Sequence, residues 1–516
     1  MLIYQFQDAF FINFSLFFFN DVDGEICIFA GLVKKANSYE AVIGLEVHAQ
    51  LRTESKLFCA DPNEFGAEPN QHTSVISLGH PGSLPRLNRK VVEYAIRLGL
   101  ATQAGIAPSL SFARKNYFYS DLPKGYQISQ HESPICEGGF IDIRMPSGEK
   151  KIRLIRIHIE EDAGKSLHDQ QPDASLIDLN RAGVPLLEIV SEPDLRSGEE
   201  AQFYLGEVRR MVRYLDICDG NMEEGSLRCD ANVSVREKGE TRLGTRTEIK
   251  NLNSMSNVRK AIEYEIKRQI ALLEQGKEVV QQTLSYDDQR NLTFPLRSKE
   301  EAEDYRYFPE PDLNPLAIDP AWISEIRKQL PALPRELFLR YTTDHQLSEQ
   351  DAGILVESPD QARYFEILAE ETGEPKTAAN WILGPVKSWL NENHARLDDF
   401  PLPPEKLASL LTLTAEGKIS HTAAQQSIFP ELIRQPDADP NELAKKLDLI
   451  QESDAKAIMK HVQAALDKYP EKIREYHKGK KGLVGLFMGE VMRSTGGKAD
   501  PSAANKMIIE ELNKRN

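Results

Sequence analysis

Cysteine is scarce in this chain, with five among 516 residues. These cysteines are scattered, odd in number and include no Cys-x-x-Cys pair: Cys27, Cys59, Cys136, Cys218 and Cys229. This pattern argues against a disulfide framework and against a zinc site built from cysteines. It suits a reducing compartment, so we expect a cytoplasmic protein.

Common motifs of nucleotide and hydrolytic sites are also missing. Residues 496–499 (Gly-Gly-Lys-Ala) lack the upstream glycine and the Ser/Thr of a phosphate-binding P-loop. No Gly-x-Gly-x-x-Gly run opens a predicted helix, and there is no Gly-x-Ser-x-Gly or His-Glu-x-x-His sequence. A nucleotide, if one binds, is therefore expected on a sheet rather than in a P-loop.

No apolar run is long enough to span a bilayer. The Phe-rich segment 10–19 is broken by Asn13 and Ser15, and it lacks the preceding basic residues of a signal peptide. We therefore expect no membrane association. Residues 1–38 are atypical, and we interpret them as a dispensable extension or a misassigned start. Because no methionine lies between Met1 and Met145, a later start would need another codon.

The net charge of −16 argues against a general nucleic-acid coat but allows a local basic patch. Residues 471–516 hold ten Lys/Arg against six Asp/Glu. This basic balance indicates either a nucleic-acid contact or a solvated helical face, and composition alone favours the solvated face.

Length and pattern indicate two or three domains of different character. Residues 39–290 are strand-rich, with helices predicted at 89–100, 197–216 and 255–275. The Pro-rich segment 308–320 is predicted to be an ordered linker, and nearly everything after it has helical periodicity. For the helix at 255–275 we predict an apolar face of Val258, Ile262, Ile266, Ile270 and Leu273.

The stretch 41–51 alternates apolar and polar residues, which predicts a half-buried strand. Successive strand side chains point to opposite faces, so Glu46, His48 and Gln50 share the polar face. A carboxylate and an imidazole two residues apart can converge on one cation, or they can form a solvated face. For this strand alone the solvated face is the commoner outcome.

Further carboxylates lie on polar strand faces or beside them elsewhere in the N-terminal half. Oxygen ligands with one imidazole suit magnesium better than zinc, and neighbouring Arg and Lys suit a triphosphate bridged to that metal. A single such cluster is weak evidence, but several in one region indicate phosphoryl chemistry. The candidates are Glu46/His48, Glu160/Glu161/Asp162, Glu188, Glu223/Glu224 before Asp230, and Glu248.

Long, specific strings of residues resemble one family, the B subunits of the aspartyl/glutamyl-tRNA amidotransferases. The similarity runs from Tyr39 to the C-terminus. The strings are Ile-Gly-Leu-Glu-Val-His (43–48), Ala-Arg-Lys-Asn-Tyr-Phe-Tyr (113–119), Asp-Leu-Pro-Lys-Gly-Tyr-Gln-Ile-Ser-Gln (121–130), Glu-Glu-Asp-Ala-Gly-Lys (160–165), Asn-Arg-Ala-Gly-Val-Pro-Leu-Leu-Glu-Ile-Val-Ser-Glu-Pro-Asp (180–194), Asp-Tyr-Arg-Tyr-Phe-Pro (304–309), and the runs 219–235 and 245–253.

The resemblance implies a carbon–nitrogen ligase with glutamine as amido donor. Such a protein binds mischarged Glu-tRNA(Gln) or Asp-tRNA(Asn) and uses ATP and Mg²⁺ to phosphorylate the side-chain carboxylate of the attached amino acid. Ammonia that an amidase partner, the A subunit, releases from glutamine then displaces phosphate, and a small C subunit completes a heterotrimer. The sequence leaves open which of the two tRNAs is the substrate.

The resemblance also implies an α+β fold. We expect an N-terminal, mainly antiparallel sheet cradle related to glutamine synthetase-like kinases, then an all-α domain and a small YqeY-like helical tail that contacts tRNA. The expected boundaries are 1–38 for the extension, 39–328 for the cradle, 329–442 for the helical domain and 443–516 for the tail.

Site residues follow from the same resemblance, and for each basic residue a purely structural ion pair is an equal alternative. Catalytic roles are expected for Glu46, His48, Glu161 and Asp230. Phosphate or nucleotide contacts are expected from Arg114, Lys115, Lys124 and Arg228. The expected metal ligands are Glu46, His48, Glu160, Glu161, Glu188 and Glu224.

The sequence departs from the family pattern in the loop after the first strand of the cradle. Many members carry a Cys-x-Cys and a Cys-x-x-Cys there, which together bind zinc. Only Cys59 of these is present, within Phe-Cys-Ala-Asp (58–61), and the second motif is replaced within Thr-Ser-Val-Ile-Ser (73–77). We therefore expect no zinc. Two other functions stay open: a tRNA-binding scaffold with a decayed kinase site, and the archaeal glutamate-specific paralogue, whose large inserted domain we do not find.

Overall fold

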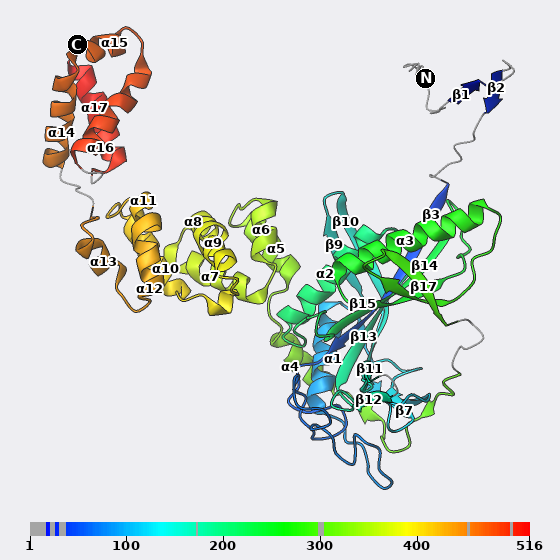
Figure 1. The fold of residues 1–516 in the computed structure, drawn as a ribbon. Coiled ribbons are helices and arrows are strands. Elements are labelled where there is room, and N and C mark those ends of the chain that lie inside the picture. Colours follow the sequence, from blue (N-terminus) through cyan, green and yellow to red (C-terminus); the bar gives the residue numbers. More distant parts are fainter. Residues whose placement is uncertain are drawn as a thin grey trace. The chain divides into compact units, whose positions relative to one another are not determined.

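The computed structural model describes residues 17–20, 26–29, 38–171, 174–297, 304–450, 455–495 and 499–515. The chain divides into two compact units, 1–330 and 331–516 (Figure 1). Among the described residues, no helix is both long and apolar enough to cross a membrane. Most of residues 1–38 lie outside the description; within them Phe17–Asn20 (β1) pairs antiparallel with Ile26–Phe29 (β2).

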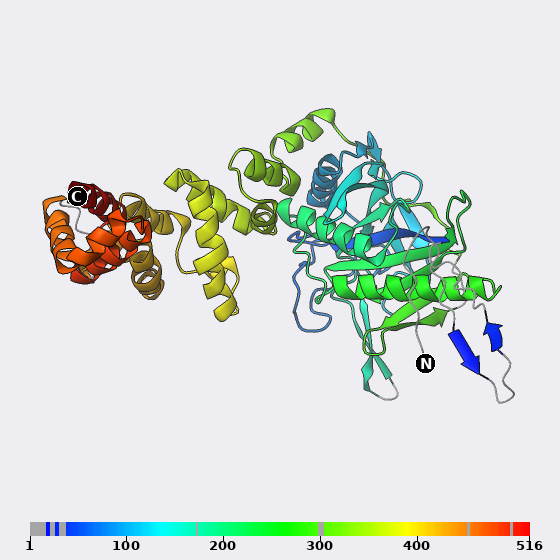
Figure 2. The same cartoon turned by 90° about the horizontal axis from the view of Figure 1, so that it is seen from above.

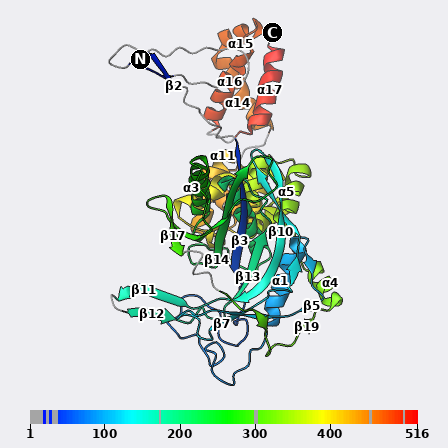
Figure 3. The same cartoon turned by 90° about the vertical axis from the view of Figure 1, so that its right-hand side faces the viewer.

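A large, mainly antiparallel sheet organises the first unit, as the sequence predicts, and β15 and β16 are its parallel neighbours. Strand β3, the predicted 41–51 strand, lies between β14 and β13 (Figure 3). In spatial order the strands are β17 (Leu292–Arg297), β16 (Thr283–Asp287), β15 (Thr247–Leu252), β14 (Leu227–Glu237), β3 (Tyr39–Gln50), β13 (Pro185–Ser191), β10 (Gly148–Glu161), β8 (Cys136–Glu137) and β4 (Gly105–Ile106), and β9 (Phe140–Met145) pairs with β10.

Smaller sheets lie beside the large one. The Pro-rich segment 308–320 is ordered, as expected, but it does not simply link two domains: its two short strands pair back onto β6 and β5 of the first unit. Proline lacks an amide hydrogen, so such a segment can join a sheet only through short edge pairings. These sheets are β18-β6-β7 (Phe308–Pro309, Ala113–Asn116, Tyr126–Ser129), β19-β5 (Leu316–Ala317, Ser109–Leu110) and β11-β12 (Lys165–Gln171, Ala174–Asp178).

Helices cover the apolar face of the large sheet. The β3 side chains of this face, Ile43, Leu45, Val47 and Ala49, are buried. Helices α2 (Gly198–Tyr214) and α3 (Met255–Glu274) lie side by side and contact the sheet, and they appear as the teal and green helices of Figure 2. Helix α1 (Arg89–Ala101) contacts β10, and α4 (Pro320–Lys328) contacts α1. The opposite, polar face of the sheet is left for the site.

The helix starts follow the sequence signals. The Ser197 hydroxyl accepts from the Glu200 amide at 3.1 Å, so Ser197 is the N-cap of α2. The Glu200 carboxylate accepts from the amide of Arg196, one residue before the cap, rather than from Ser197 itself. Asn88 caps α1 by accepting from Lys90. Each cap satisfies an amide that has no partner within the helix.

The buried face of α3 differs from the predicted apolar stripe. Val258 and Ile262 are buried as predicted, whereas Ile266, Ile270 and Leu273 are only partly buried. The inner face instead carries Glu265 and Gln269, both 0% exposed. Hydrophobic periodicity could not reveal this, because the two polar residues find hydrogen-bond partners on β15 and β17 rather than water.

In the described part of the second unit every named element is a helix, as the periodicity predicts. Its last four helices enclose their own core, which includes Val462, Leu466, Phe487 and Ile508. Helices α8 and α9 are joined by a π-helical turn, Ile382–Val386, that contains Pro385. The helices are α5 (Pro334–Thr343), α6 (Glu349–Leu355), α7 (Pro359–Thr372), α8 (Pro375–Trp381), α9 (Lys387–Glu392), α10 (Pro404–Ala415), α11 (His421–Ala423), α12 (Phe429–Arg434), α13 (Pro440–Lys446), α14 (Ala455–Lys468), α15 (Pro470–His477), α16 (Val484–Ser494) and α17 (Pro501–Lys514).

Candidate active site

Four polar side chains form a row across the polar face of the large sheet. The strand register places Arg228 opposite His48, His48 opposite Glu188, and Glu188 opposite His158. Directly opposed residues share a face and are close neighbours. The row therefore joins strands β14, β3, β13 and β10, which are far apart in the sequence.

His48 lies between two carboxylates. Its Nε2 is 3.3 Å from an oxygen of Glu46 and 3.3 Å from an oxygen of Glu188. Burial by itself lowers the pKa of His48, but hydrogen bonds to Glu188 and Glu46 and their negative charges outweigh burial and raise this pKa to about 10. Without a cation, the imidazole ring therefore supplies the positive charge that the two carboxylates need.

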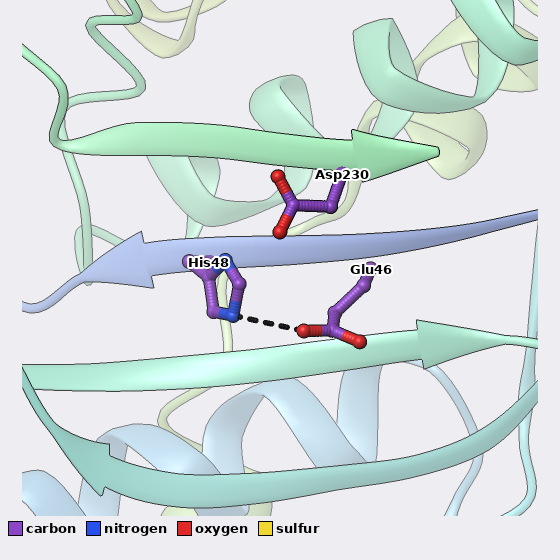
Figure 4. Close-up of side chains that lie close together, drawn as sticks. All are labelled: Glu46, His48 and Asp230. Atoms are coloured by element: carbon purple, nitrogen blue, oxygen red, sulfur yellow. Dashed lines mark ion pairs between the residues drawn. The ribbon is translucent and has the colours of Figure 1, made fainter. Parts of the chain in front are cut away.

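Glu46, His48 and Asp230 form the first of two groups that could hold a cation. Their ligand atoms all lie within 4.8 Å of one another, and the three side chains are partly exposed. Figure 4 shows Glu46 and His48 on β3 and Asp230 on the neighbouring strand. Two carboxylates and one imidazole are a donor set that suits Mg²⁺ or Mn²⁺.

His158, Glu160 and Glu188 form the second group, and all three are buried. Nε2 of His158 is 3.4 Å from Glu188 and 3.6 Å from Glu160, while its buried Nδ1 finds no hydrogen-bond partner in the described part of the chain. Glu188 contacts the histidines of both groups. His158 was not among the predicted ligands, although its alternation with Glu160 repeats the Glu46/His48 pattern and could have indicated it.

Lys115 borders the second group. Its Nζ is 3.4 Å from Glu160, and the hydroxyl of Ser129 donates to the other oxygen of the same carboxylate at 2.6 Å. Burial would raise the pKa of Glu160, yet Lys115, His158 and Ser129 hold this pKa well below its usual range. The second group therefore keeps its negative charge despite its burial.

Lys250 borders the first group and was not predicted. Its Nζ is 2.6 Å from Asp230 and 3.0 Å from Glu248. Burial opposes the charge of Lys250, but these two carboxylates outweigh it and raise its pKa. The alternation of Glu248 and Lys250 in the sequence could have indicated that they share a strand face. The sequence did not reveal that their strand, β15, lies beside β14.

Glu161 was predicted as a metal ligand, and this stays a prediction: within the described residues it belongs to neither group. It adjoins Glu160 on β10, and adjacent strand residues point to opposite faces. Its carboxylate accepts from the Ile128 amide at 2.8 Å and pairs with Lys124. Glu161 and Lys124 line a separate cavity of about 200 Å³ with Phe58, Cys59 and Gly183.

The role predicted for Glu224 as a metal ligand also stays a prediction. Glu224 is exposed in the turn before β14 and lies in neither group among the described residues. Its amide donates to the side chain of Asn221, which helps to form this turn. Because Glu224 precedes the strand rather than lying on it, its side chain does not share the polar face with Asp230.

The four basic residues predicted to contact phosphate all form ion pairs. Arg114 binds Glu310 through two hydrogen bonds of 2.7 and 2.9 Å, and Arg228 donates to buried Asp162 at 2.6 Å. Lys115 and Lys124 each pair with a glutamate of β10. Each of the four residues therefore forms the structural ion pair that the sequence left open as an alternative. An additional role in binding phosphate stays a prediction.

Hydrogen bonds join the loop residues at the positions of the missing cysteine motifs. The Ser77 hydroxyl donates to Asp61 at 2.7 Å and accepts from the Ser74 amide at 2.9 Å. Burial raises the pKa of the Cys59 thiol to about 11, which opposes the thiolate that zinc needs. We expect elemental analysis of the purified protein to find well under one zinc per chain, and a stoichiometric amount would contradict this prediction.

Family models and known proteins match most of this chain. Residues 41–324 match the model described as the GatB/GatE catalytic domain, and residues 363–512 match the GatB domain. The aspartyl/glutamyl-tRNA(Asn/Gln) amidotransferase B subunit of Geotalea daltonii is 50% identical over 477 residues, which is 92% of this chain and 99% of that protein. The protein of the same name from Thermodesulfovibrio yellowstonii is 48% identical over 474 residues, with the same shares of each chain covered.

Proposed function

Because this chain belongs to the family of aspartyl/glutamyl-tRNA amidotransferase B subunits, we propose that its polar sheet face phosphorylates the side-chain carboxylate of mischarged Glu-tRNA(Gln), Asp-tRNA(Asn) or both. ATP is the phosphoryl donor, and ammonia then converts the activated carboxylate to the amide. The observation that carries this proposal is the pair of cation groups whose histidines, His48 and His158, both contact Glu188.

The donor set fits magnesium. The described residues of the two groups offer carboxylate oxygens and imidazole nitrogens, with no thiolate among them. Glu46, His48 and Asp230 would hold one ion, and Glu160, Glu188 and His158 could hold another. Nε2 of His158 already contacts both carboxylates of its group, whereas its buried Nδ1 has no hydrogen-bond partner among the described residues. A bound magnesium ion would neutralise phosphate oxygens and orient them for transfer.

The reaction needs two bond exchanges. In the first, a side-chain carboxylate oxygen forms a bond to the γ-phosphorus of ATP while the bond to ADP breaks. In the second, ammonia attacks the acyl carbon, the C–O bond breaks, phosphate leaves with that electron pair, and the nitrogen loses a proton. A free carboxylate is a poor acyl donor to ammonia, so the first exchange supplies the leaving group for the second.

The residues of this chain supply position and charge. Lys250 supplies a cation at the first group, and Lys115 supplies one at the second, so both ends of the row of polar side chains carry a lysine nearby. Arg228 lies in that row and is tied to Asp162, so its guanidinium has a fixed position. We propose that these three cations bind phosphate oxygens, because phosphoryl transfer depends mainly on positioning and charge neutralisation.

Partner proteins are part of the proposal. The chain has no recognisable glutaminase motif, so ammonia would come from an amidase partner, the A subunit, and a small C subunit would complete the complex. We propose that the tail, α14–α17, contacts the tRNA. Its cations Lys468, Lys472 and Lys480 form exposed ion pairs, and such pairs are weak enough to be exchanged for phosphate contacts.

The experiment is an amidation assay on the chain co-expressed with its proposed partners. Glu-tRNA(Gln) and Asp-tRNA(Asn) are each incubated with ATP, Mg²⁺ and either glutamine or ammonium. Amide formation that requires ATP with both nitrogen sources supports the proposal, and the tRNA converted defines the substrate. Binding of tRNA without any amide, even with ammonium, would favour a scaffold without a working site.

A further inference from the structure

Two aromatic segments meet beside the candidate active site. One follows β6 and supplies Tyr117, Phe118 and Tyr119; the other precedes β18 and supplies Tyr305 and Tyr307. We call these five residues the aromatic rim. Pairing of β6 with β18 holds the segments together, and the Asn116 amide donates to the carbonyl of Tyr305 at 2.9 Å.

The four tyrosine rings of the rim contact one another edge to face. The centroids of Tyr117 and Tyr305 are 5.9 Å apart, as are those of Tyr117 and Tyr119 and those of Tyr305 and Tyr307. His131 stacks flat on Tyr307, with centroids 4.0 Å apart and an angle of 4° between the planes. This packing fixes the orientation of the rings, so the rim is preorganised.

Phe118 is the most exposed large hydrophobic residue described, at 87%, and the Tyr119 beside it is 49% exposed. Within the described residues, no ring contact of Phe118 is found, whereas the neighbouring Tyr117 is held by ring contacts and by a hydrogen bond to Gln127. Covering the faces of such an exposed ring with another flat, apolar group is favourable, because it removes apolar surface from water. The rim therefore presents one free ring on a fixed aromatic base.

Lys115 and Gln127 connect the rim to the strand that carries the buried carboxylates. Nζ of Lys115 lies 5.2 Å from the ring centroid of Tyr305 and 3.4 Å from Glu160. The Tyr117 hydroxyl donates to Gln127, whose amide in turn donates to the carbonyl of Glu161 at 2.8 Å. A molecule on the rim would thus have its neighbouring atoms beside the second cation group.

Positive charge accompanies the rings. The Arg306 side chain is 82% exposed, lies between Tyr305 and Tyr307 in the sequence, and pairs with exposed Asp304 at 3.4 Å. Arg114 lies over the ring of Tyr126 at 4.2 Å. Aromatic faces interleaved with basic side chains are the usual surface for unpaired nucleotides, whose bases stack while their phosphates bind the cations.

We propose that the aromatic rim binds the unpaired 3′-terminal base of the aminoacyl-tRNA, which stacks on Phe118. This inference rests on the proposed function, because the reacting amino acid is esterified to the ribose of that last nucleotide. When its carboxylate lies at the cation groups, its base must lie within one nucleotide of them, and Lys115 links the rim to Glu160 of the second group. A flat base also matches a free ring face better than the irregular surface of a protein partner.

The test replaces the terminal adenosine of Glu-tRNA(Gln) with 2-aminopurine, whose fluorescence is quenched by stacking. The complex of this chain with its partners is titrated with this tRNA, using the wild type, Phe118→Ala and Phe118→Trp. Stacking contributes roughly 1–3 kcal/mol per base, so Phe118→Ala should weaken binding roughly 5- to 150-fold and remove the quenching. Phe118→Trp should keep both, and the KM for ATP should not change.

Phe294→Ala is the matched control. Phe294 is 41% exposed and lies on β17, an edge strand of the sheet well away from β10. This variant should quench and bind like the wild type. Unchanged quenching in Phe118→Ala would overturn the inference while amidation by the wild type still supports the proposed function. Loss of a partner protein from Phe118→Ala, with quenching intact, would assign the rim to protein contact and also overturn it.

The two proposals can fail separately. If the wild type forms no amide but its quenching depends on Phe118, the base-binding rim stands and the phosphorylation proposal fails. If amide forms and Phe118→Ala binds tRNA as the wild type does, the phosphorylation proposal stands and the base-binding rim fails.

Discussion

Replacing His48 by alanine is expected to lower ATP-dependent amidation by about 10²- to 10³-fold, the scale of losing one preorganised electrostatic group. His48 contacts Glu46 and Glu188, and it belongs to the cation group that contains Asp230. Without the ring, the first group loses its imidazole ligand. Glu46 and Glu188 also lose the positive charge that lies between them. Amidation is measured at saturating ATP, Mg²⁺ and ammonium, so that ammonia delivery does not limit the rate.

Other activities of the complex should survive this change. Glutamine hydrolysis by the amidase partner and binding of tRNA should stay within about twofold, because His48 lies on the sheet face and not in the tail. Glu46→Gln should act in the same direction. Its control is Glu263→Gln, the same chemical change on α3, where Glu263 is partly exposed and pairs with Arg259. Amidation by His48→Ala at the wild-type rate would mean that the sheet face is not the reacting site.

Replacing Glu265 by alanine is expected to cost about 2–4 kcal/mol of stability, because it leaves buried polar groups without their acceptor. Glu265 is 0% exposed and accepts from Thr247 at 2.8 Å, from Gln269 at 2.8 Å and from Thr293 at 3.2 Å. Arg268 also pairs with it, but that guanidinium can turn to water. The carboxylate thus ties α3 to β15 and β17.

Hydrogen–deuterium exchange of the β15 and β17 peptides measures this effect locally. A loss of about 2–4 kcal/mol should speed exchange there about 30-fold or more. Glu263→Ala is the control on the same helix, two residues earlier and partly exposed, and it should change exchange less than about twofold. Equal exchange in the two variants would show that the buried network does not hold these elements together.

The sequence predicts individual elements well because local patterns determine them. The alternation in 41–51 predicts both faces of β3. The resemblance adds the family and the α+β architecture. Among the predicted site residues, the structure brings together Glu46, His48 and Asp230 in one group, and Glu160 and Glu188 in the other.

What the sequence could not supply is the order of strands. His158 meets Glu188 only because β10 lies beside β13, and Lys250 meets Asp230 only because β15 follows β14. The same limit applies to Glu161 and Glu224, which lie near Glu160 and Asp230 in the chain but outside both cation groups among the described residues. The polar inner face of α3 escaped prediction for a related reason, since its partners lie on other strands.

The measurement that tests the central claim most directly follows oxygen from the amino acid to phosphate. Glu-tRNA(Gln) carrying ¹⁸O in both side-chain carboxyl oxygens is converted with ATP, Mg²⁺ and ammonium, and the released phosphate is analysed by mass spectrometry. Phosphorylation of the carboxylate predicts one ¹⁸O atom in each phosphate and one left in the amide. Phosphate without ¹⁸O, formed together with the amide, would contradict the claim that this face activates the carboxylate by phosphorylation.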